Sequence, residues 1–275
     1  FTLAIALAKE KNADIIVGTD PDADRVGAVV KDDKGDYIVL TGNMTGALLT
    51  EYILSQRKAQ GKLPANGAVI KTIVTTEMTR YICQVKNHNF LQSGEYEYVF
   101  GFEESYGSLP GTYARDKDAV AATLLICEMA AYYKSKGMTL YDGLLALYKK
   151  YGFCKEGIKS LTLKGIEGLE KIQKIMATFR ENTPSEFAGI AVTWARDYKT
   201  KVFKNIKTGE TEEDTLPTSD VLHYTLEDGT WICIRPSGTE PKLKFYYGVK
   251  GTSVEDADAK IAALDKAVDK KLEEI

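Results

Sequence analysis

The sequence has few of the residues that build zinc sites, and it has no long hydrophobic run. Of its 275 residues only 2 are histidine and 4 are cysteine, and no Cys-x-x-Cys pair occurs. So few ligands, far apart in the chain, argue against a zinc site, and buried free thiols indicate a reducing compartment. No apolar run approaches the length of a membrane span. We therefore expect a cytoplasmic protein with no membrane partner.

The sequence also lacks a large excess of charge. Its net charge is −3, and its 16 tyrosines are scattered rather than interleaved with a basic stripe, so nucleic acid is not an expected partner. A hydrophobic content of 44% is enough for two domains or slightly more. Neither an initiator methionine nor a signal-peptide segment opens the chain, and residues 1–8 begin in mid-helix pattern. We expect a piece of a longer protein.

An acidic loop follows the first predicted strand. The apolar run 15–17 leads into Gly18-Thr19-Asp20-Pro21-Asp22-Ala23-Asp24-Arg25. Because alternate residues of a tight loop point the same way, the carboxylates of Asp20, Asp22 and Asp24 can converge. They would repel one another without a cation, and Mg²⁺ accepts carboxylates while leaving positions for phosphate oxygens. Arg25 adds a planar fork for a phosphate.

Two other interpretations of this loop exist. A calcium loop also begins Asp-x-Asp-x-Asp, but it requires a later Gly, a bidentate Glu and flanking helices, whereas residues 26–30 continue as a strand. The remaining alternative is an Asp-rich turn that binds no metal.

Hydrophobic periodicity predicts alternating helices and strands up to about residue 152, and a strand-rich region after it. The fold class is therefore α/β, followed by an α+β domain. Helices are expected over 1–11, 45–60, 78–85, from about 118 to 136, over 139–151, about 168–180 and 253–275. Strands are expected over 14–19, 25–30, 37–40, 68–74, 96–100, 230–234 and 243–249.

Polar residues follow the strand predicted at 96–100. They form the loop Gly101-Phe102-Glu103-Glu104-Ser105-Tyr106-Gly107. Ligands of open α/β sheets bind at the carboxyl ends of strands, and Glu103 and Ser105 could both face a ligand rich in hydroxyl groups. A solvated acidic turn is the alternative. The next charged run, Arg115-Asp116-Lys117-Asp118, precedes a long helix, so Asp116 or Asp118 could be its N-cap.

A third loop has the composition of a phosphate site. It is Arg235-Pro236-Ser237-Gly238-Thr239-Glu240-Pro241, with Lys242 and Lys244 after it, between two predicted strands. An Arg fork, two hydroxyls, a glycine and nearby lysines provide the donors that a phosphate dianion needs. A plain hairpin turn, the alternative, would not need paired hydroxyls.

The three loops, in this order, resemble those of the α-D-phosphohexomutase superfamily, and the second is most similar to that of the bacterial phosphoglucomutase/phosphomannomutase branch. The resemblance covers essentially the whole chain. It implies mixed-sheet phosphohexomutase-type α/β domains followed by an α+β C-terminal domain. The implied parts are the end of a second domain with the metal loop (1–40), a third domain with the sugar-binding loop (41–152) and a C-terminal domain with the phosphate loop (153–275).

The resemblance also implies an activity. Members are intramolecular phosphotransferases that interconvert hexose 1-phosphate and hexose 6-phosphate, here phosphoglucomutase in the first place, through a phosphoserine and a hexose 1,6-bisphosphate. By position, Asp20, Asp22 and Asp24 would hold Mg²⁺. Arg25 would lie beside the transferring group, and Lys117 is a candidate for proton transfer or substrate contact. The implied substrate-binding residues are Glu103, Ser105, Arg235, Ser237, Gly238 and Thr239.

The sequence departs from the family pattern twice. The domain that carries the phosphorylated serine has no counterpart, so the isolated chain is expected to be inactive. The usual Thr-Gly-aromatic-Lys run does not occur between residues 80 and 94. The alternative functions are phosphomannomutase, phosphopentomutase, and a sugar-phosphate-binding fragment without turnover.

Overall fold

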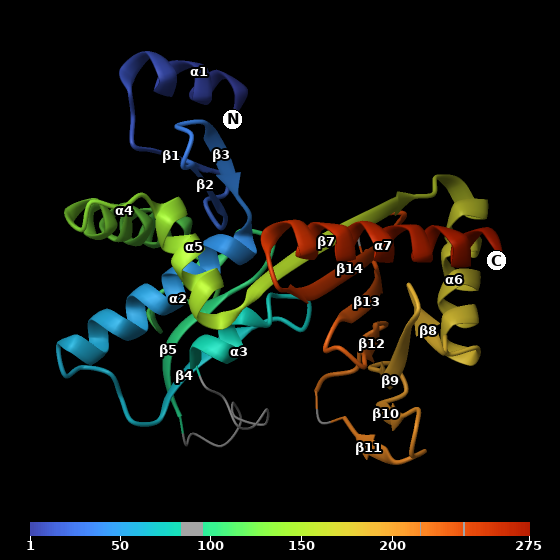
Figure 1. Cartoon of the computed structure of the whole chain (residues 1–275). Helices are drawn as coiled ribbons and strands as arrows, with labels where there is room; N and C mark the ends of the chain where they lie inside the picture. Colours follow the sequence, from blue (N-terminus) through green and yellow to red (C-terminus); the bar gives the residue numbers. More distant parts are fainter. Residues whose placement is uncertain (84–95, 215, 239) are drawn as a thin grey trace. The chain divides into compact units, whose positions relative to one another are not determined.

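The chain divides between Gly152 and Phe153 into two units, which are described separately (Figure 1). The structure is a computed structural model, and it describes residues 1–83, 96–214, 216–238 and 240–275. Both units combine helices with sheets, so the fold is mixed α/β, as the sequence predicts. Within these ranges no helix is long and apolar enough to cross a membrane.

The first unit opens with a helix and a three-stranded antiparallel sheet. Helix α1 (Thr2–Lys11) is followed by β1 (Ile15–Thr19), β2 (Val26–Lys31) and β3 (Tyr37–Leu40). The three strands pair in chain order, and β2, in the middle, is almost entirely buried. The register pairs Thr19 with Val26, so the acidic loop is the connection of a β-hairpin. Its position after the first strand agrees with the sequence prediction.

A second, mixed sheet contributes the loop 103–107. Strand β4 (Gly67–Lys71) runs parallel to β5 (Glu97–Phe102), and β5 pairs antiparallel with the short β6 (Ser108–Leu109). The strand predicted over 68–74 is too long, because the chain turns after Lys71 into helix α3 (Met78–Cys83). The strand predicted over 96–100 begins one residue too early and ends two residues too early. The C-terminal end of the predicted helix 78–85 and most of the segment 80–94 lie outside the described residues.

Three longer helices complete this unit: α2 (Gly42–Ala59), α4 (Ala119–Ser135) and α5 (Leu140–Tyr151). Each begins at a side-chain cap. Thr41 caps α2, which therefore starts three residues before the predicted Thr45. Asp118, rather than Asp116, caps α4, and Thr139 forms a capping box with Asp142 at α5. The helices pack on one another and on the two sheets through fully buried side chains such as Phe100, Leu48, Leu49, Ile126 and Leu144.

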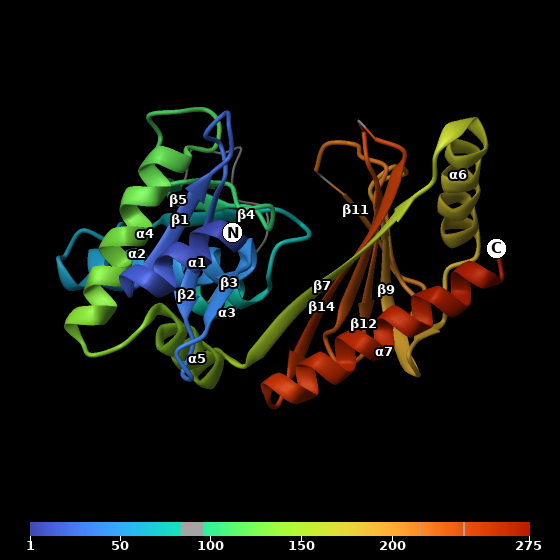
Figure 2. The same cartoon turned by 90° about the horizontal axis from the view of Figure 1, so that it is seen from above.

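The second unit is one antiparallel sheet with two helices against it. The strand order is β11-β10-β9-β12-β13-β14-β7, with β8 paired to β9. Figure 2 shows α6 (Gly165–Glu181) and α7 (Val254–Glu273) on the same face of this sheet. The strands are β7 (Phe153–Thr162), β8 (Glu186–Phe187), β9 (Ile190–Asp197), β10 (Val202–Asn205), β11 (Thr211–Glu213), β12 (Leu222–Leu226), β13 (Trp231–Pro236) and β14 (Lys242–Gly251).

The core of the second unit lies between the sheet and the helices. Alternate residues of the central strands, such as Ile232, Ile234, Phe245 and Tyr247, are almost completely buried there. Because side chains alternate along a strand, Arg235 of β13 and its partner Lys244 of β14 lie on the other face. The loop that joins these two strands is the predicted phosphate loop.

Candidate functional site

The acidic loop brings its three aspartates together. Asp20, Asp22 and Asp24 each offer a carboxylate oxygen, and these oxygens lie within 4.8 Å of one another. The backbone holds this arrangement, because Ala23 N donates to Asp20 O (3.1 Å) and Asp20 N donates to Arg25 O (3.2 Å). Ala23 has a left-handed φ of 55°, which closes the turn tightly. The convergence expected from alternate positions is therefore present in the structure.

Arg25 crosses back over the carboxylates. Its Nε donates to Asp20 Oδ2 at 2.6 Å and to Asp24 Oδ1 at 3.2 Å, and its backbone N donates to Asp20 Oδ1 at 3.1 Å. Desolvation disfavours the charged form of Asp20, but these hydrogen bonds outweigh it and lower the pKa of Asp20 to about 2. Asp20 is thus ionised at neutral pH, as a metal ligand must be.

The acidic loop is joined to the loop 103–107 through backbone hydrogen bonds. Val26 N donates to Tyr106 O (3.2 Å), and Arg25 forms a β-bridge with Gly107. Within the second loop, Glu103 N donates to Gly107 O at 2.9 Å. The two loops are more than 75 residues apart in the sequence, yet they form one continuous piece of backbone structure in the first unit.

The start of α4 is the third component of this site. Ala119 N donates to Ala23 O at 2.9 Å, which ties the helix to the acidic loop. Just before the helix, Lys117 Nζ lies 3.1 Å from Asp24 Oδ2 and 2.9 Å from Asp116 Oδ1. The hydrogen bond with Asp116 is the main cause that raises the pKa of Lys117 above its ordinary value, so its amine is charged.

Glu103 and Lys117 meet at Gly107. A Cβ atom at Gly107 would lie 2.0 Å from Lys117 Cδ and 2.8 Å from Glu103 Oε1, so only glycine leaves room for both side chains. Burial raises the pKa of Glu103, and the Lys117 charge offsets only part of this effect. The structure therefore gathers Asp20, Asp22, Asp24, Arg25, Glu103 and Lys117 in one place.

Ser105 points to a different set of partners, which the sequence did not reveal. Its Oγ donates to Glu104 Oε1 at 3.0 Å. The other oxygen of Glu104 accepts from Thr72 Oγ1 (3.2 Å) and Thr75 Oγ1 (3.4 Å), both in the turn after β4. No motif marks the two threonines. The only signal was that four polar side chains follow the ends of neighbouring strands β4 and β5.

The predicted phosphate loop lies in the second unit, between β13 and β14. Ser237 N donates to Lys242 O (2.8 Å), and Ser237 Oγ accepts from Glu240 N (3.3 Å). Arg235 is exposed, and it has no ion-pair partner among the described residues. A Cβ atom at Gly238 would meet nothing within 4 Å, so the fold of the loop does not require glycine there. Thr239 lies outside the described residues.

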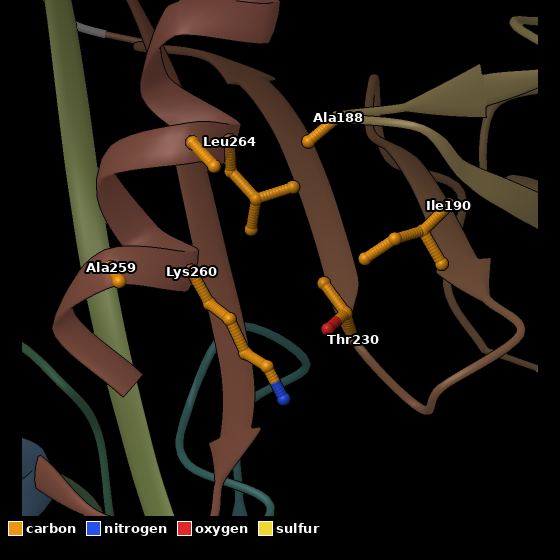
Figure 3. Close-up of a pocket in the computed structure, with 7 residues that line it drawn as sticks. Ala188, Ile190, Thr230, Ala259, Lys260 and Leu264 are labelled. Atoms are coloured by element: carbon orange, nitrogen blue, oxygen red, sulfur yellow. The ribbon is translucent and has the colours of Figure 1, made fainter. Parts of the chain in front are cut away.

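A pocket of about 270 Å³ also lies in the second unit, between α7 and the β8–β9 turn. Its lining is mainly short apolar side chains, with Leu264 and Ile190 on facing walls (Figure 3). The Nζ of Lys260, its one cation, donates to Lys250 O at 2.8 Å. Thr230, on its edge, precedes β13, whereas the phosphate loop follows it. The pocket is thus separate from the phosphate loop, and its lining does not suit a phosphate.

Comparison with known protein families shows which family this chain belongs to. Residues 41–151 match the phosphoglucomutase/phosphomannomutase alpha/beta/alpha domain III, and residues 144–266 match the C-terminal domain of the same family. The chain belongs to the phosphoglucomutase/phosphomannomutase family. The resemblance inferred from the sequence is thereby confirmed, and the loops 101–107 and 235–241 lie within the matched residues.

Individual relatives agree. A phosphoglucomutase of Staphylococcus aureus is 34% identical over 279 residues, an alignment that covers 96% of this chain and 50% of the relative. The chain thus spans about half the length of the curated relatives that it matches. Among solved structures, the phosphoglucomutase parafusin from Paramecium, in an open form, superimposes with a TM-score of 0.61 at 14% identity, covering 94% of this chain and 44% of that one. A putative phosphomannomutase from Thermus thermophilus gives a TM-score of 0.59 at 17% identity, covering 98% and 49%. These two likenesses concern the fold.

Proposed function

We propose that this chain carries the metal, sugar and phosphate sites of a hexose phosphate mutase, with phosphoglucomutase as the first choice. The observation that carries the proposal is the junction in the first unit, where three carboxylate oxygens within 4.8 Å of one another lie beside Arg25 and Lys117. Two cations beside an acidic cluster suit a reaction in which a phosphoryl group must be held and its charge neutralised.

We assign Mg²⁺ to Asp20, Asp22 and Asp24. All three donors are carboxylate oxygens, which a hard divalent cation prefers, and among the described residues no Cys or His joins the cluster. When bound, the ion would neutralise phosphate oxygens during transfer. The chain's own contribution is to bring the three carboxylates together and to favour the charged form of Asp20, whose pKa is lowered by its hydrogen bonds with Arg25.

The remaining residues take roles that follow from their contacts. Arg25 is half exposed and presents the rest of its guanidinium to a phosphate, while Lys117 presents a charged amine between Asp24 and Asp116. Because its pKa is raised, Lys117 keeps its proton, which favours a role as a cation that binds phosphate over a role in proton transfer. Glu103 and Ser105 bind sugar hydroxyls.

The phosphate that is not being transferred is assigned to Arg235, Ser237, Gly238 and Thr239. Arg235 offers an exposed planar fork, which binds phosphate through two parallel hydrogen bonds. The space around Gly238 leaves its backbone open to close approach by an anion. The family mechanism supplies the phosphoserine and the hexose 1,6-bisphosphate, and we assign no serine of this chain to phosphoryl transfer.

We retain the division into 1–40, 41–152 and 153–275 as part of the proposal. None of the four cysteines forms a disulfide, in keeping with a cytoplasmic site of action.

Two measurements test the proposal. Calorimetric titration of the chain with Mg²⁺ should show weaker binding for Asp22→Asn than for the control Asp33→Asn, which removes an exposed carboxylate from the β2–β3 turn. Equal affinity in the two variants would remove the metal assignment. Titration with glucose 1-phosphate and mannose 1-phosphate, followed by a coupled assay for the 6-phosphates, separates a catalytic chain from a binding module. Failure to bind either sugar phosphate would refute the substrate assignment.

A further inference from the structure

Glu104 forms the link between the loop 103–107 and the turn that follows β4. Its Oε1 accepts from Ser105 Oγ at 3.0 Å, and its Oε2 accepts from Thr72 and Thr75 at 3.2 and 3.4 Å. The two threonine hydroxyls also share a hydrogen bond of 2.7 Å, and because each has a single proton, only one of them donates to Glu104 at a time. Both oxygens of the carboxylate are therefore engaged, each with a neutral hydroxyl group.

The surroundings of Glu104 hold its backbone as firmly as its side chain. A Cβ atom at Gly42, the first residue of α2, would lie 2.2 Å from Glu104 O and 2.7 Å from Tyr106 N, so the helix start is packed directly on the loop. Asn43 Oδ1 accepts from Thr76 N at 2.9 Å, which joins the same helix to the turn after β4. Thr75 and Thr76 are fully buried. Both the backbone and the side chain of Glu104 are therefore restrained by their neighbours.

This arrangement determines what Ser105 can offer a ligand. An ionised carboxylate only accepts hydrogen bonds, and a serine hydroxyl has a single proton to donate. Because that proton is directed to Glu104, the free capacity of Ser105 Oγ is its lone pairs. Ser105 is therefore left as a hydrogen-bond acceptor, and so is Glu103 when it is ionised.

We propose that Glu104 is a positioning residue that fixes Ser105 as a hydrogen-bond acceptor, so that the sugar is recognised through a hydroxyl group that donates. This inference rests on the proposed function, in which Ser105 contacts a hexose phosphate. It goes further by specifying the direction of the hydrogen bond and by giving a role to Glu104, Thr72 and Thr75.

Deoxy and deoxyfluoro analogues of glucose 1-phosphate test the direction of this bond. Fluorine in place of a hydroxyl keeps weak acceptor capacity but cannot donate. At the sugar position that Ser105 contacts, the wild-type chain should bind the fluoro analogue no better than the deoxy analogue, and both should bind about tenfold more weakly than the parent sugar. In Glu104→Leu, where the Ser105 proton is released, the fluoro analogue should bind several-fold better than the deoxy one.

Two further variants and a control complete the set. Glu104→Gln keeps an acceptor oxygen for Ser105 and should restore the wild-type pattern, which a loss of packing alone would not predict. Thr72→Val removes a hydrogen-bond donor to Glu104 at an exposed position. It should raise the affinity for the fluoro analogue relative to the deoxy analogue, as Glu104→Leu does. Glu97→Leu, at the exposed start of β5, should leave it unchanged. If every variant gives the wild-type ratio of the two analogues, the proposal is wrong.

A ligand-free measurement separates this inference from the proposed function. NMR of the chain without sugar reports the χ1 rotamer of Ser105, which should be single in the wild type and averaged in Glu104→Leu. A single, unchanged rotamer in the variant overturns the positioning role, whatever the chain binds. If the rotamer responds as expected but no hexose phosphate binds, Glu104 still positions Ser105, and the assignment of a sugar ligand is what fails.

Discussion

The ammonium group of Lys117 lies 3.1 Å from the carboxylate of Asp24, so a side chain from the start of α4 already neutralises part of the acidic loop. Both side chains are only about one quarter exposed. A cation that binds the three aspartates must therefore share Asp24 with Lys117. Removal of the Lys117 charge should therefore raise the affinity for a metal ion and lower turnover.

Lys117→Met should increase the affinity of the chain for Mg²⁺, by about fivefold if the lost repulsion between the ammonium and the ion is ~1 kcal/mol, the order expected for charges about 4 Å apart in water. The same variant should reduce mutase turnover in the full-length enzyme, because the charged amine at the junction is lost. Calorimetry with Mg²⁺ measures the first effect. Lys134→Met, which breaks an exposed ion pair with Asp14, is the matched control. Unchanged or weaker Mg²⁺ binding in Lys117→Met would show that the amine does not compete with the ion.

Gly107→Ala should lower the stability of the first unit, whereas Gly238→Ala should leave the stability of the second unit unchanged. The added methyl at residue 107 meets Lys117 and Glu103 within 2.8 Å, and we expect a loss of about 1 to 3 kcal/mol in unfolding free energy, as for other overpacked positions. The methyl at residue 238 meets nothing within 4 Å. Urea unfolding of the two variants measures the difference. Gly238→Ala should instead weaken phosphate binding, and equal stability losses in both variants would contradict this assignment.

Arg235→Ala should lower kcat/KM of the full-length enzyme by on the order of 2 to 5 kcal/mol, the range for loss of one partner from a desolvated charge pair. Arg235→Lys should also be harmful, because an ammonium cannot form two parallel hydrogen bonds. Mg²⁺ binding should survive, since the aspartates belong to the other unit. Lys207→Ala, in the exposed β10–β11 turn, is the control. Normal kinetics in Arg235→Ala would mean that the loop has no role in binding phosphate.

Acid should destabilise the fold at the turn after β4, because protonation of Glu77 removes its charge. Desolvation opposes ionisation of Glu77, but the charge of Lys71, at 2.8 Å, and that of Arg80 outweigh it and lower the pKa of Glu77 from its ordinary value. A carboxyl group with a depressed folded-state pKa stabilises the fold above its unfolded value, and that contribution disappears as the pH falls through the folded pKa. Glu77→Gln should therefore cost about 1 kcal/mol at pH 7 and less at pH 3. Thermal unfolding at both pH values measures it, and a loss that does not depend on pH would point to packing instead of charge.

The sequence predicted the local features of the site well. The acidic loop follows β1 as expected, and its three carboxylates converge because alternate residues of a short hairpin connection point to one side. Local sequence patterns also predicted an N-cap at Asp116 or Asp118, of which Asp118 is the cap, and the strands on either side of the phosphate loop. These features depend on residues fewer than ten positions apart.

Features that depend on distant residues were not predictable. Lys117 reaches Asp24 because Ala119 and Ala23 share a backbone hydrogen bond, and no sequence pattern contains that pairing. The apolar run after Lys71 looked like a longer strand, but the hydroxyl groups of Thr72 and Thr75 lie 2.7 Å apart and stabilise a turn there. Glu104 acquires its role only from that turn.

The hydrogen bond from Ala119 N to Ala23 O has a consequence for protein engineering. The acidic loop looks like a portable motif, eight residues that could be grafted onto any β-hairpin. Its turn, however, contains a residue in left-handed conformation whose carbonyl is held by the first turn of a helix nearly 100 residues later. A graft of the eight residues alone would keep the carboxylates and lose the restraint on their spacing. A transplant that preserves the spacing of the carboxylates has to include the start of α4 as well.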